Sequence, residues 1–211
     1  MTGSLVIITS PSGGGKGTLI AELMKSGLGL AYSVSFTTRP KRAGEQDGKE
    51  YSFVSEAEFE RLIDEGEFLE HARVHGNYYG TSRSRVEALV GEGIDVILEI
   101  DVQGAESVMK TRPDSISIFI MPPSFEALAE RLSARKTESS EGLKLRLKNS
   151  FDEISRVNLF DYVVINDRIE DAVKRLASVI LGERQRQTRQ LDSIHAILDS
   201  FEASKSLLSE E

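Results

Sequence analysis

The sequence predicts an α/β fold in which helices cover both faces of a mostly parallel β-sheet. Short apolar runs rich in β-branched residues lie at 5–9, 94–100, 115–121 and 162–165, and such runs are typical of strands buried on both faces. A stretch with apolar residues at helical spacing follows each run. Strands that alternate with helices in this way predict parallel pairing through helical crossovers.

The first of these runs opens a strand–loop–helix unit. Residues 5–9 pass directly into Ser-Pro-Ser-Gly-Gly-Gly, and the short run and the glycines behind it favour a strand over a helix. Residues 18–25 then carry leucine, isoleucine and methionine at helical spacing. The helices expected after the other three runs span 104–111, 125–134 and the residues from 169 onward.

Two insertions interrupt this alternation. In the first, short strands at 32–38 and 51–54 flank a polar loop, a capping box at Ser55 and Glu58 starts a helix, and strand alternation returns at 67–74. The second, residues 135–148, is highly charged and lies between two helical stretches. We therefore expect a single domain, 1–211. Its core covers about 1–34, 94–130 and 152–185, the insertions about 35–90 and 131–150, and a C-terminal helical extension about 186–211.

The C-terminal extension is polar, with one narrow apolar stripe. Leu191, Ile194, Leu198 and Phe201 follow one another at spacings of three, four and three residues, which places them on one face of a helix. Two interpretations fit this pattern: a terminal helix that packs on its own core, or a helix that mediates self-association into a homo-oligomer. The sequence leaves both open.

The charge balance argues against a nucleic-acid partner. Lys and Arg total 26 against 34 Asp and Glu, a formal net charge of −8, whereas nucleic-acid-binding proteins usually carry the opposite balance. The basic residues gather in two clusters, within 39–49 and within 131–148. Local basic clusters on an acidic protein suit a small anionic ligand, and solvated helix faces explain them equally well.

The composition excludes several kinds of site. With no cysteine, the chain has no disulfide framework, thiolate zinc site or cysteine nucleophile. Its three histidines include no pair at ligand spacing on an expected helix, so we expect no metal site built from protein side chains. No apolar run approaches the ~20 residues of a membrane span, and nothing before the first strand resembles a signal peptide. We therefore expect a cytoplasmic protein without a membrane partner.

The loop after the first strand carries the strongest local motif. Its residues are Ser10, Pro11, Ser12, Gly13, Gly14, Gly15, Lys16, Gly17 and Thr18. The segment is close to the phosphate-binding pattern G-x-x-x-x-G-K-[ST], in which glycines let backbone N–H groups converge on phosphate oxygens at a helix N-terminus. The lysine reaches the β- and γ-phosphates of a nucleoside triphosphate. Two positions depart from the pattern: Ser10 replaces the first glycine, and Gly17 replaces the magnesium-binding hydroxyl residue, with Thr18 one residue later.

Three further blocks carry a resemblance to a known family. The block S-x-T-T-R-x-x-R-x-G-E begins at Ser35, G-x-Y-Y-G begins at Gly76 and L-E-I-D-x-Q-G begins at Leu98. With the Lys-Gly-Thr form of the phosphate loop, they resemble guanylate kinase, in order and at the family's spacing, from about residue 5 to about residue 181. The resemblance implies a P-loop NTPase-type core, with the first insertion binding GMP and the second forming a helical lid over ATP.

The resemblance also implies roles for individual positions. The implied contacts to the phosphate of GMP are Arg39, Arg42, Tyr51 and Tyr79, and those to the guanine are Ser35, Glu70, Thr81 and Asp101. The implied lid arginines are Arg131, Arg135 and Arg146, with Lys136 where the family commonly has glycine, and Asn166 matches an asparagine near the adenine. A carboxylate such as Glu70 suits guanine, which offers N1–H and N2–H₂ as adjacent donors that adenine lacks.

The implied reaction is transfer of the γ-phosphoryl group of ATP to GMP, and also to dGMP, in purine nucleotide metabolism. The second pKa of a phosphate monoester is about 6, so the attacking oxygen is already ionised and catalysis needs positioning and positive charge. The expected catalytic residues are Lys16, Arg39, Arg135 and Arg146, and Mg²⁺ enters with ATP.

Two rival functions compete with this one. The first is a catalytically silent, guanylate-kinase-like module that binds protein partners, against which the intact phosphate loop and the lid arginines argue. The second is a kinase for another phosphorylated small molecule, such as a ribose bisphosphate. Ser35, Glu70 and Thr81 argue against it, because a sugar phosphate has no base for them to bind.

Overall fold

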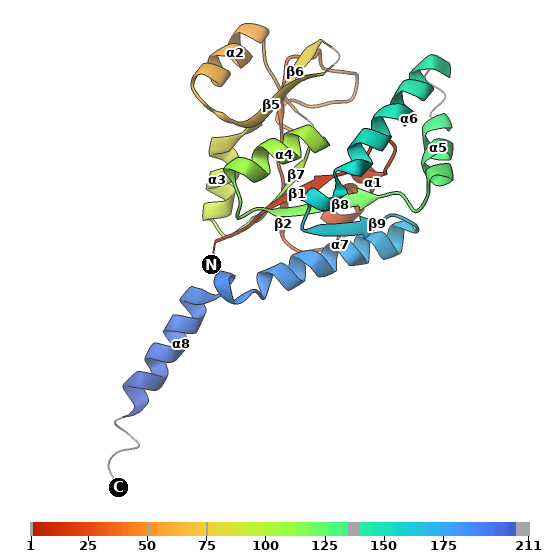
Figure 1. The fold of residues 1–211 in the computed structure, drawn as a ribbon. Helices are drawn as coiled ribbons and strands as arrows, with labels where there is room; N and C mark the ends of the chain where they lie inside the picture. Colours follow the sequence, from red (N-terminus) through yellow and green to blue (C-terminus); the bar gives the residue numbers. More distant parts are fainter. Residues whose placement is uncertain (1, 50, 75, 135–139, 206–211) are drawn as a thin grey trace.

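The computed structural model describes residues 2–49, 51–74, 76–134 and 140–205 (Figure 1). Its strands are β1 (Leu5–Thr9), β2 (Leu30–Tyr32), β3 (Phe36–Thr37), β4 (Ser52–Phe53), β5 (Phe68–Val74), β6 (Asn77–Ser82), β7 (Asp95–Glu99), β8 (Ile116–Met121) and β9 (Tyr162–Ile165). Its helices are α1 (Lys16–Met24), α2 (Glu56–Asp64), α3 (Arg83–Gly91), α4 (Val102–Thr111), α5 (Phe125–Ser133), α6 (Ser140–Ser155), α7 (Ile169–Arg184) and α8 (Leu191–Ser204), with 3₁₀ turns η1 (Val157–Leu159) and η2 (Gln187–Arg189).

Five parallel strands form the main sheet in the order β2-β7-β1-β8-β9. The central strand β1 alternates between two cores. Val6 and Ile8 pack in a cluster with α1 and α7, whereas Leu5 and Ile7 pack with α3 and α4 on the opposite face. This period-two alternation buries both faces of the strand and confirms the predicted α/β fold with helices on both faces.

A second sheet, in the order β4-β3-β6-β5, lies between β2 and β7 in the sequence. The prediction of a single strand at 32–38 is wrong, because this segment contributes to both sheets, through β2 and β3. The Ser33 N–H donates to Ile97 O of the main sheet at 2.9 Å, while two residues later Ser35 O accepts from Ser52 N–H of the second sheet at 2.9 Å. The strand β6 and the helix α3 have no counterpart among the elements predicted from the sequence.

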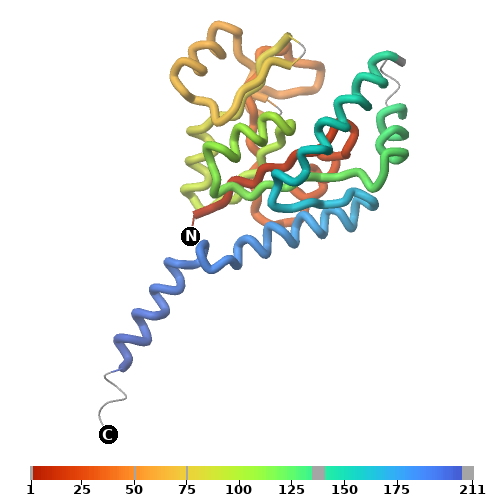
Figure 2. Tube along the Cα trace, viewed as in Figure 1, coloured from red at the N-terminus to blue at the C-terminus, as the bar shows by residue number. Residues whose placement is uncertain are grey.

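The carboxyl ends of the parallel strands meet at one edge of the main sheet. The loop after β1, the 100–101 segment after β7 and Asn166 after β9 all lie there, and the second sheet stands above the same edge (Figures 1 and 2). In α/β folds this edge is where ligands bind.

The C-terminal pattern divides into two helices joined by η2. α7 covers the main sheet, whereas α8 projects away from the body (Figure 2). Leu198 and Phe201 are 58% and 71% exposed, which contradicts the first of the two interpretations, a terminal helix that packs on its own core. Among the described residues, no helix has the length and apolar character needed to cross a membrane.

Candidate active site

The loop between β1 and α1 has the backbone conformation of a phosphate cradle. Gly13 and Gly15 adopt φ angles of 82° and 89°, a left-handed region that glycine enters without steric cost. A Cβ on Gly15 would lie 2.4 Å from Nδ2 of Asn166. Glycine is therefore required here both by backbone conformation and by the close approach of a side chain.

The two departures from the phosphate-loop pattern have different structural consequences. Ser10 is buried, and a Cβ on Gly14 would lie 2.8 Å from Ser10 Cβ, so Ser10 fits because Gly14 has no side chain. A Cβ on Gly17 would meet Glu99 Oε1 at 3.5 Å, an ordinary contact. Gly17 therefore leaves space beside an acidic group at the end of β7.

Asn166 supports the phosphate loop from the end of β9. Its Nδ2 donates to Gly14 O at 2.8 Å, and Arg131 donates to Asn166 O at 2.9 Å. Asn166 Oδ1 and Arg131 Nη1 are buried and have no hydrogen-bond partner in the described part of the chain. Buried polar groups normally have partners, so these two atoms leave hydrogen-bonding capacity beside the loop. The predicted adenine contact of Asn166 stays a prediction.

Lys16, the first residue of α1, lies between the phosphate loop and the end of β7. Its Nζ donates to Ile100 O at 2.5 Å. Burial lowers the pKa of the ammonium below its ordinary value, and the carboxylates of Glu99, Asp101 and Glu153 oppose this shift. The nearby carboxylates therefore help to keep a lysine charged at the place where a triphosphate would add negative charge.

A cavity of about 290 Å³ lies between the end of the main sheet and the second sheet. It is lined by Lys16, Tyr32, Ser35, Tyr51, Glu70, Ala72, Val74, Tyr79, Glu99, Ile100 and Asp101. The structure thus brings together six predicted site residues from separate segments: Lys16, Ser35, Tyr51, Glu70, Tyr79 and Asp101. A larger cavity, of about 550 Å³, lies near the start of β8 and β9 and contains no predicted site residue.

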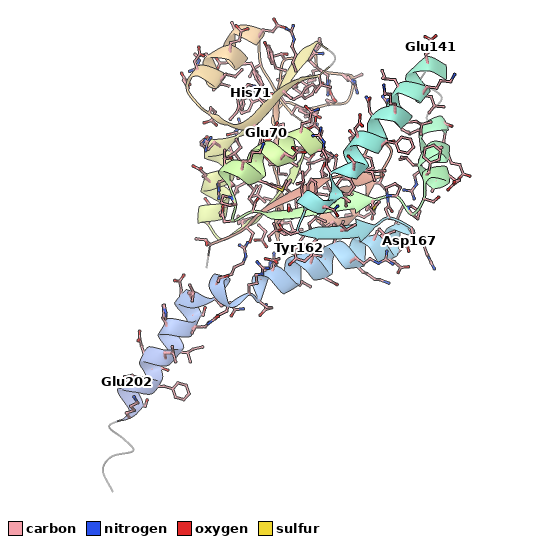
Figure 3. The ribbon with its side chains drawn as sticks, in the orientation of Figure 1. Glu70, His71, Glu141, Tyr162, Asp167 and Glu202 are labelled. Atoms are coloured by element: carbon pink, nitrogen blue, oxygen red, sulfur yellow. The ribbon has the colours of Figure 1, made fainter. Side chains whose placement is uncertain are left out.

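Glu70 supplies a carboxylate to this cavity from β5, close to α4 (Figure 3). Its Oε1 accepts a hydrogen bond from the Thr81 hydroxyl at 2.7 Å. Burial raises the pKa of Glu70 above its ordinary value, the Thr81 hydrogen bond opposes the shift, and the Asp101 charge adds to it. Thr81 itself is fully buried and is not among the lining residues. Its contact with the site is the hydrogen bond that it donates to Glu70.

Asp101 combines a structural contact with its place in the cavity. Its Oδ1 accepts the Gly104 N–H at 2.7 Å and so caps the N-terminus of α4. A Cβ on Gly104 would lie 3.3 Å from both Asp101 Oδ1 and Glu70 Oε2. The two carboxylates therefore lie beside the first turn of α4, where the helix dipole favours negative charge.

The predicted phosphate-binding arginines lie outside the lining of this cavity. Arg39 forms a two-pronged ion pair with Glu45, at 2.6 and 2.8 Å, and stacks 5.1 Å above the Tyr51 ring. The Arg39 hydrogen bonds and the Arg42 backbone N–H hold the pKa of Glu45 down to about 2. The Arg42 side chain is exposed. Arg39 is thus next to Tyr51 at the cavity wall, in an orientation set by Glu45.

Of the predicted lid residues, Arg135 and Lys136 lie outside the described residues. Arg146 lies on α6, whose first part falls within the expected lid, about 131–150. Glu153 of the same helix accepts the Ser12 N–H of the phosphate loop at 3.0 Å. Burial raises the pKa of Glu153, and its hydrogen bond from Ser12 opposes the shift.

Two contacts at the candidate site were not predicted from the sequence. One joins Glu153 to Ser12; in the other, the Tyr32 hydroxyl donates to Glu99 Oε2 at 3.0 Å. Their partners lie 141 and 67 residues apart in the chain, and no local pattern links them. The one available signal was Tyr32 itself, the first residue of the strand expected at 32–38, three residues before the Ser35 block.

The geometry brings an anion-binding loop and a lysine to one side of the strand ends, and a cavity with carboxylates and tyrosines to the other. Such an arrangement can hold two phosphorylated ligands with their phosphates facing each other. Fold and site together define a P-loop phosphotransferase of the nucleoside monophosphate kinase class.

Comparison with known proteins identifies the family. The guanylate kinase family model matches residues 2–183. Guanylate kinases of Thermotoga maritima and Methylobacillus flagellatus are 47% and 50% identical over 92% and 90% of this chain, covering 94% and 95% of their own lengths. The crystal structure of guanylate kinase from Anaplasma phagocytophilum superimposes with a TM-score of 0.72 at 38% identity, covering 89% of both chains. The chain belongs to the guanylate kinase family.

Proposed function

We propose that this chain transfers the γ-phosphoryl group of ATP to GMP, and to dGMP, with GMP in the 290 Å³ cavity and ATP on the phosphate loop. Family membership supports the reaction. The observation that carries the acceptor assignment is Glu70, a carboxylate held by Thr81 in a cavity that Lys16 also lines. A single carboxylate accepts from N1–H and N2–H₂ of guanine together, which adenine cannot match.

In this proposal, different charged residues bind the phosphates of ATP and the phosphate of GMP. Lys16 and the backbone N–H groups of the loop hold the β- and γ-phosphates, while Arg39 and Arg42, with Tyr51 and Tyr79, hold the phosphate of GMP. Arg39 is already oriented by Glu45 and by the Tyr51 ring, which supports this role because an ordered guanidinium loses little freedom on binding. The proposed lid, about residues 131–150, supplies Arg135 and Arg146 on closure.

Mg²⁺ belongs to the proposal as a companion of ATP. The described residues contain no group of three or more His, Asp or Glu side chains able to enclose a metal ion. Mg²⁺ usually retains water and binds one or two carboxylates together with substrate phosphates, and Glu99 beside Gly17 fits that mode. When bound, the ion neutralises charge on the β- and γ-phosphate oxygens. The cytoplasmic location also stays a prediction.

An ADP-release assay with Mg-ATP tests the acceptor. We expect turnover with GMP and dGMP and little with AMP, UMP or ribose 1,5-bisphosphate. Preference for the sugar phosphate would overturn the acceptor assignment, and no turnover by a folded sample that binds GMP would favour the silent module.

The variant Glu70→Gln tests the guanine contact. We expect kcat/KM for GMP to fall about 10- to 100-fold, the worth of a charge-assisted hydrogen bond, with KM for ATP unchanged. Glu92→Gln, an exposed position at the end of α3, is the matched control. Equal losses for GMP and ATP would remove Glu70 from the guanine site.

A further inference from the structure

Glu153 joins the helix α6 to the phosphate loop. Its Oε2 accepts the Ser12 N–H at 3.0 Å across 141 residues of sequence, at the flank of the glycines that form the phosphate cradle. The side chain is half-buried, and burial of a carboxylate is unfavourable unless the contacts that it makes compensate. No step of the proposed phosphoryl transfer uses this carboxylate, so its place beside the loop requires a separate explanation.

The end of α6 that carries Glu153 is fixed to the body of the molecule. Just beyond the helix, Arg156 donates to Glu106 of α4 at 2.9 Å, and Ile154 packs against the core cluster on that face of the main sheet. We call residues 150–156 the stem of α6. The beginning of the helix extends away from the body, with Glu141 at its outer end and Leu145 59% exposed (Figures 1 and 3).

Arg146 and Glu153 lie on the same face of α6. The seven residues between them make two helical turns, or about 10.5 Å along the axis, and Asn149 falls between them at spacings of three and four residues. Asn149 and Glu153 line a cavity of about 250 Å³ to which Asp101 also contributes, and Asp101 in turn lines the acceptor cavity. The face of α6 that carries Arg146 is therefore the face that meets the proposed site at the stem.

We propose that Glu153 is a positioning residue that fixes α6 to the phosphate loop and thereby places Arg146 at the transferring phosphoryl group. This inference rests on the proposed function, in which Arg146 supplies positive charge. Because Glu153 holds Ser12, the loop that seats a triphosphate and the helix that carries the arginine form one unit. Catalysis of phosphoryl transfer depends largely on such positioning, and a displacement of about 1 Å can slow a reaction about 100-fold.

A different role for Glu153 would depend on its charge alone. Burial lowers the pKa of Lys16, and the carboxylates of Glu99, Asp101 and Glu153 oppose this shift. A residue that served only to keep Lys16 charged would need a carboxylate, whereas a residue that positions α6 needs only an acceptor for the Ser12 N–H. Glutamine keeps an acceptor oxygen without the charge, so it separates the two roles.

Steady-state kinetics of Glu153→Met and Glu153→Gln tests the proposal. Methionine has a similar length and no oxygen, and we expect kcat to fall at least about 10-fold, with the KM values for ATP and GMP within about 2-fold. Glutamine should restore kcat to within about 3-fold of the unchanged chain. Glu106→Met is the matched control, because it removes the partly exposed pair between α4 and the stem and should change kcat by less than about 2-fold.

A double-mutant cycle tests whether Glu153 acts through Arg146. In an Arg146→Ala background, Glu153→Met should lower kcat by less than about 2-fold more, because the group that it positions is already absent. Additive losses, an equal loss in Glu153→Gln and Glu153→Met, or an equal loss in Glu106→Met would each overturn the proposal. Turnover of GMP by the unchanged chain decides the proposed function independently of these variants.

A distance measurement without substrates tests the contact apart from the reaction. The chain has no cysteine, so spin labels attach only at the introduced sites Lys148→Cys on α6 and Ala88→Cys on α3, both exposed positions. We expect the distribution of distances between the labels to be broader with Glu153→Met than with Glu153 or Glu153→Gln. The same distribution in all three proteins, each shown to be folded by circular dichroism, would overturn the proposal.

Discussion

At the scale of single residues, two hydroxyl groups hold two carboxylates at the acceptor cavity. The Thr81 hydroxyl of β6 donates to Glu70 of β5 at 2.7 Å, and the Tyr32 hydroxyl of β2 donates to Glu99 of β7 at 3.0 Å. Each hydrogen bond joins neighbouring strands and orients a carboxylate that the proposed reaction uses. Removing one hydroxyl therefore tests orientation without removing the charge.

Replacing Tyr32 with Phe removes one oxygen atom. We expect kcat to fall about 3- to 10-fold, the worth of about 1 kcal/mol of hydrogen bonding, and a higher Mg²⁺ concentration to be needed, because Glu99 loses its orientation. Steady-state kinetics across a Mg²⁺ titration measures both effects. Tyr162→Phe removes a hydroxyl that donates to Glu183, outside the acceptor cavity, and should leave kcat unchanged. An equal loss in both variants would contradict a role for Tyr32 at the site.

Replacing Thr81 with Val changes the pH dependence. Burial raises the pKa of Glu70 and the Thr81 hydrogen bond lowers it, so the variant should have a still higher pKa. Guanine binding needs the carboxylate, and kcat/KM for GMP should therefore begin to fall at a higher pH than in the unchanged chain as pH decreases. Titration of the GMP phosphate affects both proteins equally. Thr81→Ser keeps the hydroxyl and should keep the original profile; a shift in this control would contradict the explanation.

At the scale of elements, the phosphate loop depends on contact between the ends of β1 and β9. Asn166 donates to Gly14 O at 2.8 Å, and its Nδ2 occupies the space where a Cβ on Gly15 would lie. The position of β9 in the sheet therefore helps to set the conformation of the loop after β1.

Replacing Gly15 with Ala should disrupt this junction. The left-handed φ of 89° and the 2.4 Å approach to Asn166 together cost about 1–3 kcal/mol or more, and KM for ATP should rise by at least about 10-fold. Chemical denaturation and kinetics measure the two effects. Gly182→Ala in α7, where a Cβ meets nothing within 4 Å, should instead stabilise the fold by up to about 1 kcal/mol. Normal ATP affinity in Gly15→Ala would contradict the required loop conformation.

At the scale of the whole molecule, one end of the main sheet carries the proposed site and the other end carries contacts that stabilise the fold. The carboxyl ends of the strands carry the proposed site, whereas the start of β7 carries a structural junction. There Asp95, which is 5% exposed, accepts from Ser4 N–H and from Arg184 Nε, both at 2.7 Å. This junction ties the N-terminal segment, β7 and the end of α7 together.

The variant Asp95→Ala separates stability from catalysis. It leaves Arg184 Nε and the buried Ser4 N–H without their shared acceptor, while Arg184 still donates to Leu28 O, and the free energy of unfolding should fall by about 2–4 kcal/mol. Urea denaturation measures this loss, and kcat at low temperature should not change. Asp114→Ala, which breaks an exposed pair with Arg112, should change stability by less than about 0.5 kcal/mol. A large loss of kcat in folded Asp95→Ala would contradict the separation.

The sequence by itself determined the parts of the molecule that local patterns encode. The β-branched run at 5–9 and the glycines after it identified β1 and the phosphate loop, because burial on both faces and backbone freedom are properties of the residues themselves. The motif blocks at Ser35, Gly76 and Leu98 supplied the family and five of the eleven residues that line the acceptor cavity: Ser35, Tyr79, Glu99, Ile100 and Asp101.

Tertiary structure alone decided the features that depend on distant partners. Three features each pair residues far apart in the chain. They are the change of sheet between Ser33 and Ser35, the hydrogen bond from the Tyr32 hydroxyl to Glu99, and the contact of Glu153 with the phosphate loop. The exposure of the apolar stripe of α8 likewise depends on what the rest of the chain packs against it. Apolar spacing shows which face of a helix needs cover, but only the packed fold shows whether the chain's own core provides it.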